Sequence, residues 1–300
     1  MPGARTPGAR EAWAAWAMCL PAVGSIAAVA LFPLLWAGWE SLHVHDLRMP
    51  WLGRPFVGLA NYVEAIGDAR FRAALSHTAA FAAVSVSLEL ALGTLLALAL
   101  DGARRGVART AALLPWAIPT VVAALVWRFL FDGPTSAANE IVRVLALDDA
   151  PIVWLAEPWL AWVPIVLADV WKTTPFVALL LLAALQNVPA ELVEAARSDG
   201  ANAWQRFWHV SFPTLRPALL VALLFRTLDA FRVFDLVFVL TGGGPGTATE
   251  PVALYTFQVL LRDLRFGYGS ALSMTIFLAT FALAWLYVRL AGGALLERER

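Results

Sequence analysis

Six stretches of this sequence are long and apolar enough to cross a lipid bilayer, and this feature constrains the fold more than any other. They lie at about 13–39, 75–100, 110–131, 159–185, 217–240 and 270–290. A spanning helix needs about 20 mostly apolar residues, and in lipid the backbone must satisfy its own hydrogen bonds. With no low-complexity linker between the stretches, the sequence predicts an all-α integral membrane protein with six transmembrane helices in one domain, 1–300.

The composition agrees with this prediction. Of the 300 residues, 60% are hydrophobic and 15% are charged, whereas soluble domains average about 25% charged residues. The formal net charge of +0 provides no basic face, which argues against nucleic-acid binding. The single cysteine, Cys19, lies in an apolar run and has no partner for an internal disulfide.

The N-terminal segment places Arg5 and Arg10 before the first apolar stretch. The apolar core of a signal peptide is about 7–15 residues long. This stretch is longer, and no clear small-residue cleavage site follows it. We therefore expect it to be retained as the first transmembrane helix.

Arginine is distributed unevenly between the two sides of the predicted protein. The short segments of one side hold Arg5, Arg10, Arg104, Arg105, Arg109, Arg197, Arg206, Arg216, Arg298 and Arg300. The opposite loops also contain arginines, but these loops are longer and hold acidic residues as well. Short cytoplasmic loops are enriched in Lys and Arg. The pattern therefore predicts that both termini and the loop at 187–216 are cytoplasmic.

Prolines interrupt two of the apolar stretches: Pro115 and Pro119 in the third, Pro164 and Pro175 in the fourth. Proline removes a backbone hydrogen bond and kinks a helix. In a membrane such breaks persist only where protein or a polar cavity satisfies the freed carbonyls. Ordinary kinks and a mobile, gated path both remain open interpretations.

The loop at 187–216 carries the signals of two helices joined by a turn. Glu194 lies in a first helix that follows Pro189. Gly200 is suited to end that helix in the left-handed conformation. Asn202, with Gln205 three residues later, predicts a capping box for a second helix.

The predicted second helix has one apolar stripe. Trp204, Phe207 and Trp208 recur at helical spacing, and we expect Pro213 and Pro217 to end this helix and begin the fifth span. The pattern alone fits two interpretations equally: an amphipathic pair at the lipid headgroups, or a docking element for another protein.

Several motifs resemble one family. Glu194-Ala195-Ala196, three residues, Gly200, nine residues and then Val210-Ser211-Phe212-Pro213 resemble the EAA motif of ABC-importer permeases, which usually ends in Ile-x-Leu-Pro. The segments 56–62, 114–119 and 241–245, with Trp127, are similar to carbohydrate permeases. The segments 170–176 and 224–232 look like permeases for trehalose and related α-glucosides.

The resemblance implies a type I ABC importer permease, with six transmembrane helices and a cytoplasmic EAA coupling helix. It implies that this helix docks on an ATPase subunit, and that Trp204, Phe207 and Trp208 pack the loop against its own helices. The residues that it assigns to coupling are Glu194, Ala195, Ala196, Asp199, Gly200 and Pro213. The chain itself is then expected to bind no cofactor, while ATP is used by the partner ATPase.

No motif for enzymatic chemistry is evident. A P-loop needs G-x-x-x-x-G-K-[ST], but the only lysine, Lys172, lies in an apolar span, and the glycine-rich turn at 242–246 has none. His43 and His45 lack an evident third metal ligand. We expect a transport subunit that is not an enzyme and holds no metal.

Charged residues lie inside the fourth and fifth predicted spans: Asp169 and Lys172 in the fourth, and Arg226, Asp229, Arg232 and Asp235 in the fifth. A charge at the bilayer centre costs about 2.5–3.5 kcal/mol. Such groups can pair with helical neighbours or line a polar path for sugar. In the maltose-like branch, the helices flanking the EAA loop carry the substrate contacts. The resemblance thus points to a cargo path of Asp169, Thr173, Phe176, Arg226 and Asp229.

The expected assembly has several parts. It comprises a second homologous permease, two cytoplasmic ATP-binding subunits and an extracytoplasmic solute-binding protein, in the inner membrane. The expected cargo is an oligosaccharide such as trehalose or maltose. Another carbohydrate-family cargo such as glycerol phosphate is an alternative. An ATPase-independent secondary transporter gives no reason for the EAA spacing, and a membrane enzyme would need a catalytic constellation that is not evident.

Overall fold

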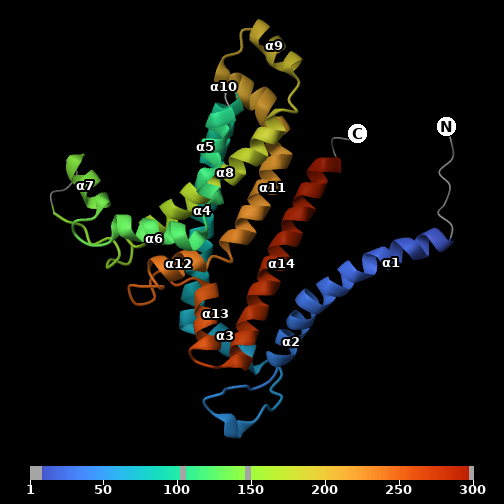
Figure 1. The fold of residues 1–300 in the computed structure, drawn as a ribbon, viewed down its shortest axis with the longest axis vertical. Coiled ribbons are helices and arrows are strands. Elements are labelled where there is room, and N and C mark those ends of the chain that lie inside the picture. The colour runs from blue at the N-terminus through green and yellow to red at the C-terminus, as the bar shows by residue number, and fades with distance from the viewer. Residues whose placement is uncertain (1–8, 102–105, 146–149, 297–300) are drawn as a thin grey trace. The chain divides into compact units, whose positions relative to one another are not determined.

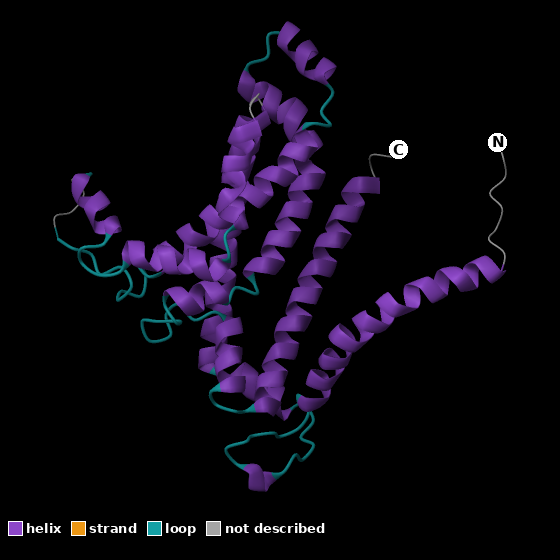
Figure 2. Ribbon diagram, viewed as in Figure 1, coloured by secondary structure: helices purple, strands orange, loops and turns teal. Residues whose placement is uncertain are grey.

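The computed structural model describes residues 9–101, 106–145 and 150–296, and builds this part of the chain from helices and loops (Figure 2). Five of the described helices are long and apolar enough to cross a membrane, or six if one bent pair counts as a single span. The expected all-α membrane fold is therefore confirmed. Arg5, Arg104, Arg105, Arg298 and Arg300, which contributed to the predicted sidedness, lie outside the described residues.

The chain divides into two compact units, Met1–Gly67 with Phe257–Thr275, and Asp68–Thr256 with Ile276–Arg300. Two helices, α13 (Val252–Leu261) and α14 (Phe266–Leu296), contribute residues to both units. The expectation of one domain over the whole chain stays a prediction.

The first unit begins with a long, exposed apolar helix. It consists of α1 (Ala9–Ile26), a π-helical turn (η1, Ala27–Leu31) and α2 (Phe32–Glu40). A 3₁₀ turn (η2, Pro50–Leu52) and α3 (Ala60–Gly67) follow. Asn61, in the segment 56–62, donates hydrogen bonds from Nδ2 to the carbonyl oxygens of Ser41 at 2.7 Å and His43 at 3.0 Å. These two hydrogen bonds hold α3 against the residues that directly follow α2.

The second unit contains most of the remaining helices. They are α4 (Ala69–Asp101), α5 (Gly106–Ala117), α6 (Thr120–Phe131), α7 (Ala137–Val144), α8 (Trp162–Leu185), α9 (Ala190–Ser198), α10 (Ala203–Arg206), η3 (Phe207–Ser211), α11 (Phe212–Ala230) and α12 (Asp235–Leu240). Helices α4, α8 and α11 pack against one another (Figure 1). Their shared apolar cluster includes Ala97, Leu181 and Leu215.

The crossing of α4 and α8 depends on a glycine. A Cβ at Gly93 would lie 2.6 Å from Cγ1 of Val177 and 3.3 Å from the backbone nitrogen of Ala178. Only a residue without a side chain leaves room for this close approach. Gly93 therefore sets the distance between the two helices that carry much of the second unit's core.

The third apolar stretch is broken rather than straight. α5 and α6 meet at a bend of 93°. Pro119 adopts an extended conformation, with φ −55° and ψ 137°, and precedes the first residue of α6. Pro115 stays inside α5. Of the two prolines predicted to disturb this span, Pro119 marks the break.

The helix in the region of the fifth predicted span, 217–240, differs from that range at both ends. The helix starts at Ala203, runs through Pro213 and Pro217 and ends at Ala230, and α12 begins after a break at 231–234. The π-helical turn η3 directly precedes the first turn of α11, where Pro213 lies. The missing proline N–H is tolerated in a first turn, and the wider π turn allows the helix to continue.

Candidate functional site

Arg226 is the centre of a charged cluster inside the second unit. Its guanidinium donates from Nε to Oε2 of Glu89 at 2.5 Å and from Nη2 to Oε1 of Glu89 at 2.9 Å. This is a bidentate fork between α11 and α4, the strongest common geometry for such a pair. Glu89 is 0% exposed and Arg226 is 3% exposed. The pair is therefore almost fully buried inside the second unit.

Two further carboxylates surround the same guanidinium. Nη2 of Arg226 lies 3.3 Å from Oδ2 of Asp169, on α8, and Nη1 donates to Oδ2 of Asp229, one turn further along α11. The hydroxyl of Thr173 is 2.8 Å from Oε1 of Glu89 and 2.6 Å from the carbonyl oxygen of Asp169. We call Glu89, Asp169, Thr173, Arg226 and Asp229 the Arg226 cluster. It joins α4, α8 and α11.

A cleft of about 190 Å³ opens over this cluster. It is lined by Thr120, Asp169, Lys172, Thr173, Arg226, Asp229, Ala230, Arg232, Val233, Phe234, Asp235 and Leu236. The cleft lies where helices are interrupted, at the start of α6 and at the break between α11 and α12. Non-helical backbone at membrane depth persists only beside protein or a polar cavity. The polar cleft therefore explains why these two helix breaks are tolerated.

Four of the five sequence-predicted cargo-path residues line this cleft: Asp169, Thr173, Arg226 and Asp229. Phe176 is not among the lining residues. Its ring lies 6.0 Å from that of Trp116 and 6.4 Å from that of Phe225, and it packs against the core cluster. The structure brings the polar candidates together, and the expected role of Phe176 in the cargo path stays a prediction.

Glu89 was missed by the sequence analysis, which considered charges only in the fourth and fifth stretches. The signal was present, because Glu89 is an acidic residue in the middle of the apolar stretch 75–100. An intramembrane carboxylate usually has a partner. Here that partner is Arg226, 137 residues later in the chain. Local sequence spacing does not predict a contact between residues so far apart in the chain.

The segment between α8 and α11 has the predicted local structure. Gly200 has φ +81°. The N–H of Ala201 bonds to the carbonyl of Ala196 at 2.9 Å, and that of Gly200 to Arg197 at 3.0 Å. These two bonds form the Schellman end of α9. Asn202 and Gln205 form the expected capping box.

The residues predicted for coupling lie on an exposed surface. α9 has no buried residue, and Figure 1 shows it at one end of the second unit. Glu194, Ala195 and Asp199 are exposed and Ala196 is half-buried. Pro213 lies apart from them, in the first turn of α11. The first five of the six residues therefore share one projecting helix–turn, and Pro213 belongs to the helix that supports it.

The aromatic residues of this segment differ from one another in their surroundings. Phe207 packs against the core cluster. Trp204 is 69% exposed, although its ring lies 5.5 Å from that of Trp208. Phe207 thus packs the loop against the unit's own helices as expected, whereas most of the Trp204 side chain is available to lipid or to another protein.

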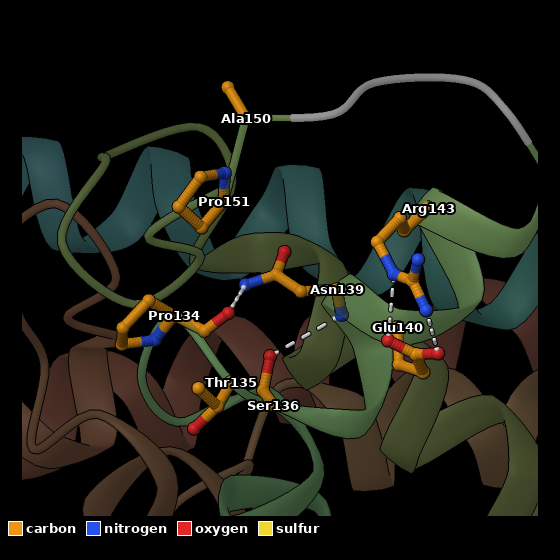
Figure 3. A pocket seen from close by; sticks show the side chains of 8 residues that line it. All are labelled: Pro134, Thr135, Ser136, Asn139, Glu140, Arg143, Ala150 and Pro151. Atoms are coloured by element: carbon orange, nitrogen blue, oxygen red, sulfur yellow. Dashed lines mark hydrogen bonds and ion pairs between the residues drawn. The ribbon is translucent and has the colours of Figure 1, made fainter.

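A second hollow, of about 210 Å³, lies beside α7 (Figure 3). Asn139 holds its wall by donating to the carbonyl oxygens of Pro134 and Ile152 at 3.1 and 2.9 Å. Arg143 donates to Glu140 at 3.0 and 2.6 Å, and these hydrogen bonds lower the pKa of Glu140 below its usual value. Both side chains are exposed, so this ion pair contributes little to stability.

No group of three or more potential metal ligands occurs within the described residues. His45 instead bonds through Nδ1 to Glu40.

Comparison with known proteins places the chain in a defined group. A family described as binding-protein-dependent transport system inner membrane component matches residues 89–293. The chain is 41% identical over 283 residues to the trehalose/maltose transport system permease protein MalF of Thermococcus litoralis, covering 93% of this chain and 94% of that protein. It is 41% identical over 282 residues to the trehalose transport system permease protein SugA of Mycobacterium tuberculosis, covering 93% and 89% respectively.

A solved structure shares the fold. One chain in the crystal structure of a bacterial ABC transporter involved in the import of the acidic polysaccharide alginate matches with a TM-score of 0.80, covering 94% of this chain and 96% of that chain. The identity is 20%, so this likeness concerns the fold alone.

Proposed function

This chain belongs to the family of binding-protein-dependent transport system inner membrane components, and from that premise we propose that it moves a neutral α-linked disaccharide, such as trehalose or maltose, through the cleft over the Arg226 cluster. The chain is a permease subunit of an ABC importer and a multi-pass inner-membrane protein. It is not an enzyme; in such importers separate subunits hydrolyse ATP.

The observation that carries the choice of cargo is the balance of charge in the cleft. Its lining holds three cations, Lys172, Arg226 and Arg232, and three carboxylates, those of Asp169, Asp229 and Asp235. A balanced set of donors and acceptors suits a polyhydroxyl molecule, whose hydroxyls both donate and accept. The two relatives at 41% identity are named for trehalose and maltose transport, which supports the same class of cargo.

The proposed coupling element is α9 with its turn. Glu194 is exposed on a helix whose end is fixed by Gly200, and the exposed carboxylate is suited to pair with a basic residue of a cytoplasmic ATPase subunit. Ala195 and Ala196 leave room for close approach, and Asp199 lies at the turn. Pro213, at the start of α11, marks where the coupling segment continues into a span.

The proposed importer contains this chain, a second homologous permease, two ATP-binding subunits and an extracytoplasmic solute-binding protein. Both termini and α9 face the cytoplasm in this proposal. The cluster of arginines around α9, at Arg197, Arg206 and Arg216, supports that side.

The cargo proposal is tested by reconstituting the whole importer in proteoliposomes and measuring uptake of labelled trehalose. We expect unlabelled trehalose or maltose to compete, and glycerol phosphate not to compete. Stronger competition by glycerol phosphate than by either disaccharide would overturn the neutral cargo. Asp229→Asn should lower disaccharide uptake at least tenfold, because Asp229 lines the cleft and its side chain is 70% exposed.

The coupling proposal is tested by Glu194→Ala in the same complex. We expect uptake to fall at least tenfold while the subunit still inserts and assembles. Glu191→Ala, one turn earlier on the same exposed helix, is the matched control and should retain uptake. Equal uptake by the Glu194 variant and the control would contradict a coupling role.

A further inference from the structure

Glu89 is a fully buried carboxylate that does not line the cleft but contacts two residues that do. Both of its oxygens accept from Arg226, and Oε1 also lies 2.8 Å from the hydroxyl of Thr173. Arg226 and Thr173 both line the cleft. Glu89 is 0% exposed and comes from α4, which contributes no residue to the lining.

The geometry points to Glu89 as a positioning residue for cargo recognition, an inference that rests on the proposed function. Glu89 occupies the Nε–Nη2 edge of the guanidinium. Arg226 is thereby fixed in one orientation, with Nη1 directed to Asp229. Glu89 never touches the cargo and acts through the side chains that do.

The charge arrangement explains why such a residue is needed. Three carboxylates surround one guanidinium, and two of them, Asp169 and Asp229, line the cleft. Each of these two already gives one oxygen, Oδ2, to Arg226. Without Glu89, the charge of Arg226 would be balanced by them alone, and the attraction between opposite charges would draw their second oxygens to the guanidinium as well. With Glu89 in place, Oδ1 of each carboxylate remains an acceptor for cargo hydroxyls, and the side chain of Asp229 is 70% exposed.

The test uses the complete reconstituted importer with saturating loaded binding protein, and measures two rates: disaccharide uptake and ATP hydrolysis. Glu89→Gln keeps the shape of the side chain but removes its charge and one acceptor. We expect the number of sugar molecules moved per ATP to fall at least fivefold, with complex yield and stimulated ATPase rate within twofold of the unchanged protein. Ser87→Ala, an exposed position two residues away on α4, is the matched control and should leave the ratio unchanged.

A merely structural role for Glu89 gives a different result. Yield, uptake and ATPase rate would then fall together, leaving the ratio of sugar to ATP unchanged, and this outcome would overturn the inference. If Glu89→Gln does not assemble, Glu89→Asp decides. It keeps the charge but is one methylene shorter, so it holds Arg226 in a displaced position, and we expect the ratio to fall at least twofold.

Failure of the proposed function is distinguishable from failure of this inference. If the unchanged importer moves no disaccharide, the cargo is wrong. If it does move one, and both Glu89 variants keep the unchanged ratio of sugar to ATP, the cargo is right and Glu89 has no positioning role.

Discussion

Arg226 is buried in a membrane protein together with three carboxylates that balance its charge. The guanidinium makes a fork with Glu89 and reaches Asp169 and Asp229 with its remaining edge. Removing one member of a buried ion pair leaves the other charge without compensation, which costs about 3–5 kcal/mol. The cluster is therefore most sensitive to the loss of Arg226, its one cation, because the guanidinium keeps two carboxylates when the charge of Glu89 is removed.

Arg226→Met should lower the stability of the second unit by about 3–5 kcal/mol, because Glu89 stays buried without its partner. The measurement is the thermal unfolding midpoint of the purified importer in detergent. Arg232→Gln is the control, since Arg232 lines the same cleft but is exposed. Combining Arg226→Met with Glu89→Leu should recover most of the loss. A single variant as stable as the control would contradict this account.

Gly200 carries a different constraint, that of backbone conformation. Its φ of +81° costs an L-residue with a side chain about 1–2 kcal/mol. Gly200→Ala should therefore raise amide hydrogen exchange in α9 at least about fivefold. Gly67→Ala is the control, because Gly67 also ends a helix but has no positive φ and no neighbour within 4 Å. Equal exchange in the two variants would rule out a role for the left-handed turn.

At this scale, the sequence predicts what depends on neighbouring residues. Gly200 ends α9 and Asn202 caps α10 as expected, because both features depend on positions three or four apart. Asp169, Thr173, Arg226 and Asp229 were found as charged or polar residues in apolar stretches. Glu89 was missed because its importance lies in a contact with α11 that no local pattern encodes.

Of the two helix breaks beside the cleft, one has a local cause in the sequence and the other arises from contacts between distant residues. Pro119 marks the bend between α5 and α6 in the sequence itself. The break at 231–234 has no proline or glycine, and its residues Phe231, Val233 and Phe234 look like a continuing apolar span. It arises where the helix meets the polar cleft, which is a property of the packed unit.

The close crossing of α4 and α8 depends on the absence of a side chain at Gly93. Gly93→Ala should push the helices apart, since its Cβ would lie 2.6–2.7 Å from two atoms of Val177. We expect the free energy of unfolding to fall by about 1–3 kcal/mol, the usual cost of overpacking. The check is the thermal midpoint of the detergent-solubilised complex.

Gly93→Ala combined with Val177→Gly is the matched rescue, because it moves the missing side chain to the other helix. The double variant should be more stable than Gly93→Ala alone. If it is less stable by the sum of both single effects, the two residues do not limit the crossing distance.

In the proposed orientation of the whole molecule, α9 and the hollow beside α7 face opposite sides of the membrane. Cys19 is the only cysteine, so its replacement by serine gives a background for single introduced cysteines. Ser198→Cys, on exposed α9, should react with a membrane-impermeant maleimide only when the cytoplasmic side is accessible. Thr135→Cys, at the exposed hollow beside α7, should react from the opposite side. Labelling of both from one side would contradict the proposed orientation.

The continuous helix from Ala203 to Ala230, which includes the π-helical turn η3, has a mechanical consequence. Trp204 and Arg226 lie on this one helix, 22 residues apart in the chain, a separation of about 33 Å along the axis at 1.5 Å per residue. A rod of that length tilted by about 5° moves its far end by about 3 Å, roughly the length of a hydrogen bond. A small rotation of this helix at the projecting end is thus magnified into the making or breaking of a contact at the guanidinium.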